Sequence, residues 1–193
     1  EFVPVVVKSA AAKQEAQAAS GSCGYSSAYF GKTELEDLMS AKGCVGIRIY
    51  NAKTEQTQHH CDVVAVAVNA DGKEIPSFGK KYLHGTSFDN NPNCPSSKVN
   101  KTNAKGYVEN VASSSTLEYQ KVFFSKSLIN ERLAVSGGTT GINVLPGDLG
   151  GQKTMMVSAA KLDSGKVTDL GGTYMKSKLP CPTDCGDVDN YLV

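Results

Sequence analysis

Two neighbouring stretches of the sequence decide the fold: CVGIRIY at Cys44–Tyr50 and CDVVAVAV at Cys61–Val68. In the first stretch apolar and polar residues alternate, which places its valine and isoleucines on one face of a β-strand. The second stretch is apolar almost throughout, as expected of a strand that is covered on both faces. A polar connection at residues 51–60 joins the two, so we predict an antiparallel pair.

Two helices are predicted before this pair. Ser9 is a suitable N-cap for a helix that continues to Ala19, and the apolar face of this helix consists of alanine alone. Alanine buries little area, so this helix needs a partner surface within the subunit or on another copy. Thr33 with Glu36 forms a capping-box pattern for a second helix, which ends at Gly43.

After the strand pair, turn chemistry at residues 69–73 reverses the chain. The later segments are predicted as a long loop at residues 76–104, a strand at 116–124, a short helix at 126–135, a glycine-rich loop at 136–151 and a strand or helix at 153–161. No internal repeat is recognised in the sequence.

These elements predict an α+β fold, with a single domain that holds an antiparallel sheet, two N-terminal helices and long loops. The chain has 193 residues, 40% of them apolar, which is enough to form one core. We expect residues 1–28 to form an extended segment and an alanine-rich helix that are available as an assembly arm. Residues 29–193 are expected to form the globular domain.

Charge and hydropathy exclude several classes of partner. The formal net charge is +1 and the lysines are scattered along the chain, so nucleic acid and anionic membranes are poor partners. No apolar run approaches the roughly twenty residues that cross a bilayer, so no transmembrane segment is predicted. The expected partner is another copy of the chain, in a homo-oligomer or polymer.

The six cysteines are candidates for disulfide bonds: Cys23, Cys44, Cys61, Cys94, Cys181 and Cys185. An even number of cysteines fits disulfides in an oxidising compartment, with about fifteen connectivities if all six pair. The alternative for Cys44 and Cys61 is a buried thiol in an apolar strand.

The residues that can carry chemistry form no recognised catalytic or metal-binding motif. His59, His60, Cys61 and Asp62 are consecutive, but adjacent residues of a strand point to opposite faces, so one metal ion can take only two of them. The acidic tail around Asp187 lacks the pattern of a calcium-binding loop. No catalytic residue, metal or cofactor is therefore predicted.

The stretches Tyr29–Lys32 and Gly43–Tyr50 resemble an uncharacterised family of small proteins from Bacteroidetes. The apolar strand with the turn after it continues the likeness, so that the resemblance covers roughly residues 29–75. The ending Pro180–Cys185, of the CPxxC type, is also similar to that family. The resemblance implies a fold and a bacterial origin, and it implies no activity.

These observations favour a non-catalytic structural or self-assembling, filament-like subunit at the cell surface or outside the cell. The assembly candidates are the short β-prone ends of the chain, which are suited to strand addition on a neighbouring subunit: Val3, Val5, Val6, Val7, Tyr191, Leu192 and Val193.

Two other functions remain open at this point. One alternative is a ligand- or protein-binding module on the loops around Tyr82, His84, Phe88 and Asn90. The second alternative is an enzyme that uses a Cys/His pair, for which His84 is the best nominee.

Overall fold

The computed structural model describes residues 4–19, 27–57, 61–75, 82–86, 96–114 and 121–178. These residues form four helices and ten strands. The helices are α1 (Ser9–Ala19), α2 (Lys32–Met39), α3 (Lys101–Ser114) and α4 (Lys126–Leu133). The strands are β1 (Val5–Lys8), β2 (Ala28–Gly31), β3 (Gly46–Ala52), β4 (Asp62–Val68), β5 (Tyr82–Gly85), β6 (Ser96–Val99), β7 (Lys121–Ser125), β8 (Gly141–Leu149), β9 (Gln152–Asp163) and β10 (Lys166–Lys176).

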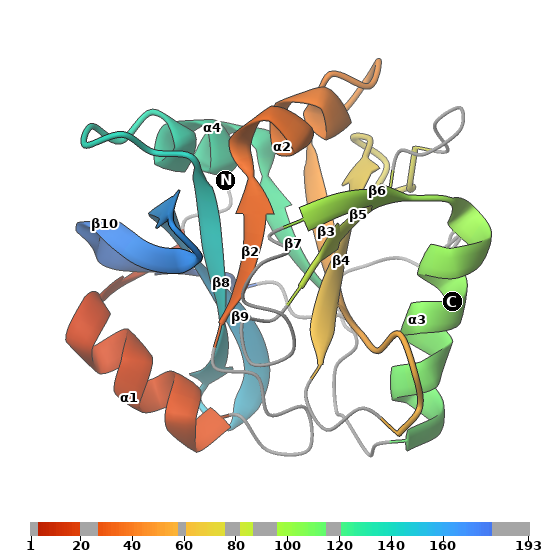
Figure 1. Cartoon of the computed structure of the whole chain (residues 1–193), viewed down its shortest axis with the longest axis horizontal. Helices are drawn as coiled ribbons and strands as arrows, with labels where there is room; N and C mark the ends of the chain where they lie inside the picture. Colours follow the sequence, from red (N-terminus) through yellow and green to blue (C-terminus); the bar gives the residue numbers. More distant parts are fainter. Residues whose placement is uncertain are drawn as a thin grey trace.

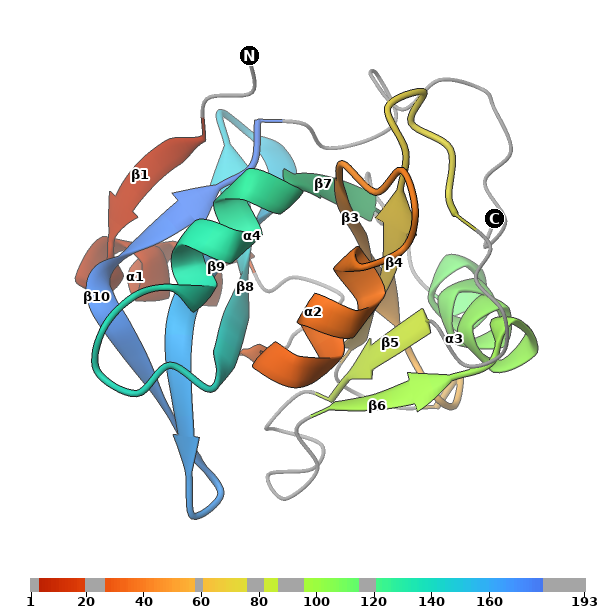
Figure 2. The ribbon, with the colours of Figure 1, turned by 90° about the horizontal axis from the view of Figure 1, so that it is seen from above.

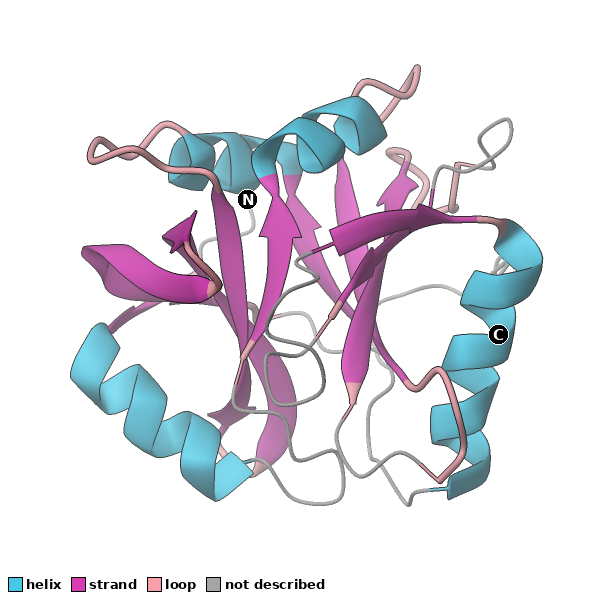
Figure 3. Cartoon of the chain, viewed as in Figure 1, coloured by secondary structure: helices cyan, strands magenta, loops and turns pink. Residues whose placement is uncertain are grey.

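The strands form two antiparallel sheets of five strands each. Sheet 1 has the order β1-β10-β9-β8-β2, and sheet 2 has the order β6-β5-β4-β3-β7. Figure 1 shows the two sheets side by side, with α1 outside the first and α3 outside the second, while α2 and α4 lie across the top. The same layers are seen by secondary structure in Figure 3.

The main core lies between the inner faces of the two sheets. Phe30 and Ile142 of sheet 1 share this core with Ile47 and Phe124 of sheet 2, and the buried faces of α2 and α4 close it at one end. Seen from above in Figure 2, α2 and α4 lie next to each other over the space between the sheets. Two smaller clusters lie on the outer faces, one under α1 and one under α3.

The order of elements reveals an internal duplication. Elements β1-α1-β2-α2-β3-β4-β5 form a first half, and β6-α3-β7-α4-β8-β9-β10 repeat the same order as a second half. Replacing each element of sheet 1 by its counterpart reproduces the strand order of sheet 2. Each sheet therefore combines a three-stranded meander from one half with two strands from the other half.

The strand register matches between the halves. Gly31 lies opposite Gly141 where β2 meets β8, and Ser125 lies opposite Gly46 where β7 meets β3. Gly141 and Gly46 are required by the same close approach of two strands. A Cβ at Gly141 would overlap the carbonyl oxygen of Phe30, and a Cβ at Gly46 would overlap that of Phe124.

The backbone hydrogen bonds that hold α2 and α4 are also equivalent. Lys32 N donates to Thr140 O at 2.7 Å, and Lys126 N donates to Val45 O at 2.8 Å. Each bond joins the first residue of a helix to the segment just before a strand of the other half. The prediction that the chain has no internal repeat is therefore wrong.

The strand pair predicted from residues 44–68 is confirmed. β3 and β4 are antiparallel neighbours, with Ile49 opposite Ala65, and every residue of both strands is buried. The short extended segment at β1, the alanine-faced helix α1 and the helix at residues 126–135 are also present. The mixed helix and strand content is confirmed. The prediction of a single sheet is wrong, because the described strands form two sheets. Two of the four helices precede the strand pair, and the other two follow it.

The predicted capping box of α2 is wrong. The helix begins at Lys32, and its N-cap is Gly31, which has no side-chain hydrogen bond. The equivalent residue of α4 does cap: Ser125 Oγ accepts a hydrogen bond from Leu128 N at 3.2 Å.

Two segments predicted as loops contain regular structure. Residues 76–104 include β5, β6 and the start of α3, and residues 136–151 include β8. The open choice at residues 153–161 is resolved as strand β9. These strands carry serines, glycines and a proline that make them resemble loops, and their cross-strand partners specify them instead.

Residues 5–19, expected as an assembly arm, lie on the chain's own sheet. β1 pairs with β10, with Val5 opposite Lys176 and Lys8 opposite Thr173. α1 buries Ala12 and Ala16 against Leu145 of the same sheet. The partner surface that the alanine helix needs is therefore supplied within the chain.

Candidate functional site

The candidate functional site is the open edge of sheet 1, formed by β1. β1 pairs with β10 on one side. Its residue Val7 packs on the small apolar cluster under α1. Val6 alternates with Val7 and is 61% exposed, the largest value among the large apolar side chains of the described residues. No other described strand pairs with the far side of β1, so the strand presents backbone groups and one exposed valine at the same edge.

The counterpart of β1 in the second half is β6, the edge strand of sheet 2, and its chemistry differs. Lys98 is exposed and forms an ion pair with Asp37 of α2. Ser96 Oγ accepts a hydrogen bond from Gly31 N at 3.0 Å. Lysine on an edge strand opposes the addition of another strand. β1 has such a lysine at its last residue, Lys8, after three valines, whereas β6 has Lys98 after two serines, so β1 is the more apolar of the two edges.

The other two edges, β2 and β7, turn toward the opposite sheet. β2 is buried at all four residues and approaches β5 closely, because Gly85 faces the ring of Phe30. On the equivalent side, Ser177 Oγ donates to Phe123 O at 2.9 Å. Among the described strands, β1 and β6 are therefore the edges that remain open.

Three described members of the predicted assembly set lie at this edge. Val5, Val6 and Val7 belong to β1, and of these Val6 has the exposed side chain. Val3 and the C-terminal residues Tyr191–Val193 lie outside the described residues.

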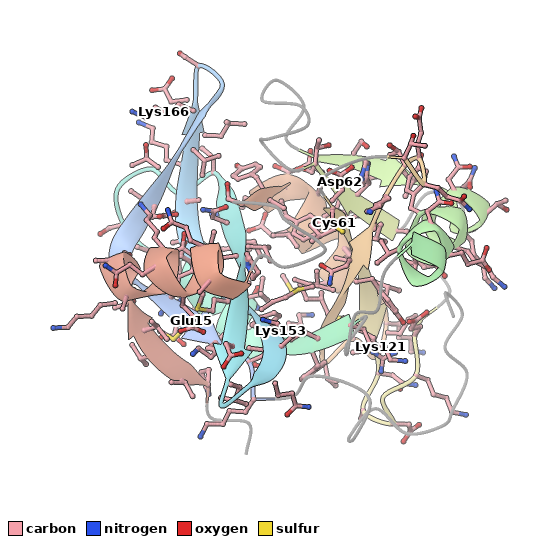
Figure 4. All side chains as sticks on the ribbon, turned by 90° about the horizontal axis from the view of Figure 1, so that it is seen from below. Glu15, Cys61, Asp62, Lys121, Lys153 and Lys166 are labelled. Atoms are coloured by element: carbon pink, nitrogen blue, oxygen red, sulfur yellow. The ribbon has the colours of Figure 1, made fainter. Side chains whose placement is uncertain are left out.

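His84, the nominee for catalysis or binding, lies on β5 and contacts Asp62 at the start of β4. The two side chains are buried, and His84 Nε2 is 3.0 Å from Asp62 Oδ2. The ring of Tyr107 on α3 lies 5.2 Å from the His84 ring, centroid to centroid. Figure 4 labels Asp62 and Cys61, which are consecutive at this end of β4. A buried carboxylate on an imidazole is an arrangement that can orient a general base.

The equivalent site on sheet 1 has the same position and other chemistry. Lys176 occupies the place of His84 in its strand, and its Nζ is 2.6 Å from Glu15 Oε1 on α1. Glu15, labelled in Figure 4, also accepts a hydrogen bond from Asp148 N at 2.6 Å. Tyr107, the counterpart of Glu15, accepts one from Lys53 N through its carbonyl oxygen at 2.9 Å. Both sites tie a helix to the outer face of a sheet.

A buried ion pair lies on the outer face of sheet 2. Arg48 Nη1 is 3.3 Å from Glu74 Oε1, and Arg48 Nη2 donates to Gly72 O at 2.7 Å. Tyr50 OH also donates to Glu74. Burial raises the pKa of Tyr50 above its ordinary value, and the nearby carboxylate of Glu74 raises it further. The alternating sequence of β3 places Arg48 and Tyr50 on the face opposite the isoleucines, but it does not show which residues cover that face, so this cluster was missed.

Lys121 of β7 lies opposite Tyr50, beside this ion pair. Burial lowers the pKa of Lys121, and the charge of Arg48 lowers it further. The neighbouring Glu74 opposes this shift without cancelling it.

The equivalent carboxylate on sheet 1 is Asp169. It accepts hydrogen bonds from Tyr174 OH at 2.6 Å, Asn143 Nδ2 at 2.9 Å and Ser158 Oγ at 3.2 Å. Lys13 of α1 completes the cluster at 3.3 Å. Burial and the Asp169 carboxylate raise the pKa of Tyr174. The two clusters are equivalent. Glu74, which follows β4, binds Arg48, and Asp169, which follows β9, binds Asn143 at the position equivalent to Arg48.

The described cysteines differ in state. Cys44 carries a free thiol, and its Sγ donates to Gly46 O at 3.3 Å. The expectation that Cys44 forms a disulfide is not met in this structure. Cys61 is fully buried and is not a free thiol. The other four candidates, Cys23, Cys94, Cys181 and Cys185, lie outside the described residues.

In the part of the chain that is described, no group of three or more His, Cys, Asp and Glu residues could hold a metal ion. His59 and His60 lie outside this part, as do Phe88, Asn90 and the acidic tail around Asp187. Asp62, considered as a ligand, contacts His84 instead.

Comparisons with known proteins found no matching family model, no similar curated protein and no similar solved structure. The resemblance to a Bacteroidetes family therefore stays a prediction. No helix within the described ranges is both long and apolar enough to cross a membrane.

Proposed function

We propose that this protein is a non-catalytic, self-assembling subunit that associates with a second copy through the β1 edge. The observation that carries the proposal is the exposure of Val6 on an open edge strand in which three consecutive valines precede Lys8. An edge of this kind recruits another strand through backbone hydrogen bonds, and apolar side chains add to the affinity.

The sequence of β1 suits pairing with itself. In an antiparallel pair of two copies centred on Val6, each Val5 lies opposite Val7 of the second copy, and the two Val6 side chains meet on one face. Lys8 then lies opposite Pro4, so the two lysines are at opposite ends of the pair. Such an interface is two-fold symmetric and joins two copies of sheet 1 into one continuous sheet.

The polar groups of the described residues support a structural role. His84 of β5 contacts the ring of Tyr107 on α3, and the equivalent Lys176 of β10 pairs with Glu15 on α1, so each side chain joins its sheet to a helix. Asp62, the other partner of His84, lies in the same sheet as His84. The proposal therefore assigns His84 to holding α3 in place.

The test is the mass of the protein in solution, measured by light scattering after size-exclusion chromatography over a range of concentrations. We expect a concentration-dependent dimer for the native chain and a monomer for Val6→Lys, both purified without unfolding, because a lysine at the centre places two like charges opposite each other.

Val45→Lys is the matched control. Val45 is the other exposed large apolar side chain of the described residues, at 41%, and it lies before β3, away from β1. This variant should dimerise like the native chain. A native monomer at every concentration, or equal loss of dimer in both variants, contradicts the proposal.

The proposal includes an oxidising compartment, at the cell surface or outside the cell. Two observations support this location: the Cys61 side chain is buried, and its sulfur is not a free thiol. Peptide mapping of unreduced protein from its natural source should find Cys61 in a disulfide and Cys44 alkylated as a free thiol. A free Cys61 would contradict this location.

A further inference from the structure

The two halves of the chain form one interlocked unit. β1 and β2 of the first half join the meander of the second half in sheet 1, and β6 and β7 join the meander of the first half in sheet 2. Neither half completes a sheet by itself. The largest part of the core consists of contacts between the halves, with Phe30 opposite Ile142 and Phe124 opposite Ile47.

We propose that the surface which each half presents to the other also binds the corresponding half of a second copy, so that two chains exchange halves. The partner is another copy of this chain, and the bound segment is its β1–β5 or its β6–β10 half. This exchange uses a different surface from the β1 edge and does not depend on the proposed function.

Every contact between the halves can form equally within one chain or between two. The hydrogen bonds from Lys32 N to Thr140 O and from Lys126 N to Val45 O each join one half to the other. Either bond could also form between the first half of one copy and the second half of another. The exchanged dimer and the monomer therefore hold the same core, and the protein concentration during refolding decides which of them forms.

Complementation between two damaged full-length chains tests the exchange. Phe30→Asp damages the first half and Phe124→Asp damages the second, because each places a carboxylate at a buried core position. Each variant alone should fail to fold. Refolded together, they should form a soluble dimer with equal amounts of both chains, since exchange brings one intact first half to one intact second half.

The matched control pairs Phe30→Asp with Leu35→Asp, a second buried position of the first half. No exchange can assemble an intact unit from this pair, so it should stay insoluble. All these variants also carry Val6→Lys, so that pairing through β1 contributes nothing. Absence of rescue in the first mixture, or equal rescue in both mixtures, overturns the proposal.

A second measurement needs no damaged core. The Val6→Lys chain, refolded from urea at increasing concentration, should yield a growing fraction of dimer that persists after dilution, because reversal requires the halves to separate. Refolding that gives monomer alone at every concentration overturns the exchange and leaves the β1 proposal unaffected.

Discussion

The outer face of each sheet holds a carboxylate that polar side chains bind, but the side chains differ between the two sheets. On sheet 2, the Glu74 carboxylate binds the fully charged Arg48 and the Tyr50 hydroxyl. On sheet 1, the Asp169 carboxylate binds the neutral Asn143 and the Tyr174 hydroxyl. Arg48 and Asn143 occupy equivalent positions of β3 and β8, opposite equivalent residues of β7 and β2.

The difference shows which feature the fold requires at this position. A carboxylate and a tyrosine hydroxyl occur in both clusters, while the third group is a cation in one and an amide in the other. Loss of the cation leaves an unpaired charge, whereas loss of the amide leaves a carboxylate with other donors. The two clusters therefore predict different costs for equivalent substitutions.

The largest expected effect is that of Arg48→Met. Glu74 has no exposed side-chain surface and would lose the guanidinium that it contacts, which should lower the free energy of unfolding by about 3–5 kcal/mol. The equivalent Asn143→Leu should cost about 1–3 kcal/mol, because Asp169 keeps Tyr174, Ser158 and Lys13. Urea unfolding of both variants measures the difference.

The double variant Arg48→Met with Glu74→Gln removes both charges and is the control for this comparison. It should recover part of the stability lost in Arg48→Met. Equal costs for Arg48→Met and Asn143→Leu, or no recovery in the double variant, would show that the charge of Arg48 is unimportant.

The helix ties should have a smaller effect. His84→Gln removes the ring that contacts Asp62 and Tyr107, and Glu15→Gln removes the ionic partner of Lys176. Each should lower the free energy of unfolding by about 1–3 kcal/mol. Hydrogen exchange should rise in α3 for the first variant and in α1 for the second. If both variants loosened the same helix, the assignment of one tie to each sheet would be wrong.

Alkaline pH should weaken the tyrosine clusters. The folded-state pKa of Tyr50 and Tyr174 lies above the ordinary value of 10.0, so their contribution to stability is complete below about pH 10 and is lost as the pH rises further. The lowered pKa of Lys121 acts in the opposite direction.

The double variant Tyr50→Phe with Tyr174→Phe isolates the tyrosine contribution. Its stability should fall less steeply above pH 10 than that of the native chain, as measured by urea unfolding. The ultraviolet absorbance of tyrosinate should show two fewer ionisations at the unfolding transition. Identical pH profiles would contradict burial of both hydroxyls.

The smallest effect on stability is expected at the β6 edge. Lys98→Val removes an exposed ion pair with Asp37, which should cost about 0–1 kcal/mol. It also makes β6 resemble β1, so this variant should form larger assemblies than the native chain in light scattering. Unchanged mass would show that Lys98 does not protect the edge.

The sequence predicts the elements whose pattern is strong and local. β3 and β4 are recognisable because they are long, apolar and close in sequence, and α2 is recognisable by Leu35, Leu38 and Met39 on one face. β8 is not recognisable, because Gly141, Pro146 and Gly147 resemble a loop. Its partners on β2 and β9 make it a strand, and they are invisible in a local window.

The duplication leaves little trace in the sequence. Tyr29-Phe30-Gly31-Lys32 corresponds to Phe123-Phe124-Ser125-Lys126, but most equivalent positions keep only their size or polarity. Arg48 and Asn143 occupy equivalent positions, and so do His84 and Lys176, but the two side chains of each pair differ in chemistry. The exposed valine of β1 was predicted as part of a longer set, and among the members that the structure describes Val5 and Val7 are half-buried while Val6 is exposed.

The most direct test of assembly through β1 compares amide hydrogen exchange in the two edge strands as protein concentration rises. The account predicts that exchange slows with concentration in Val5–Lys8, where a second copy pairs, and stays constant in Ser96–Val99. Constant exchange in both strands, or slowing in β6 alone, would contradict assembly through the β1 edge.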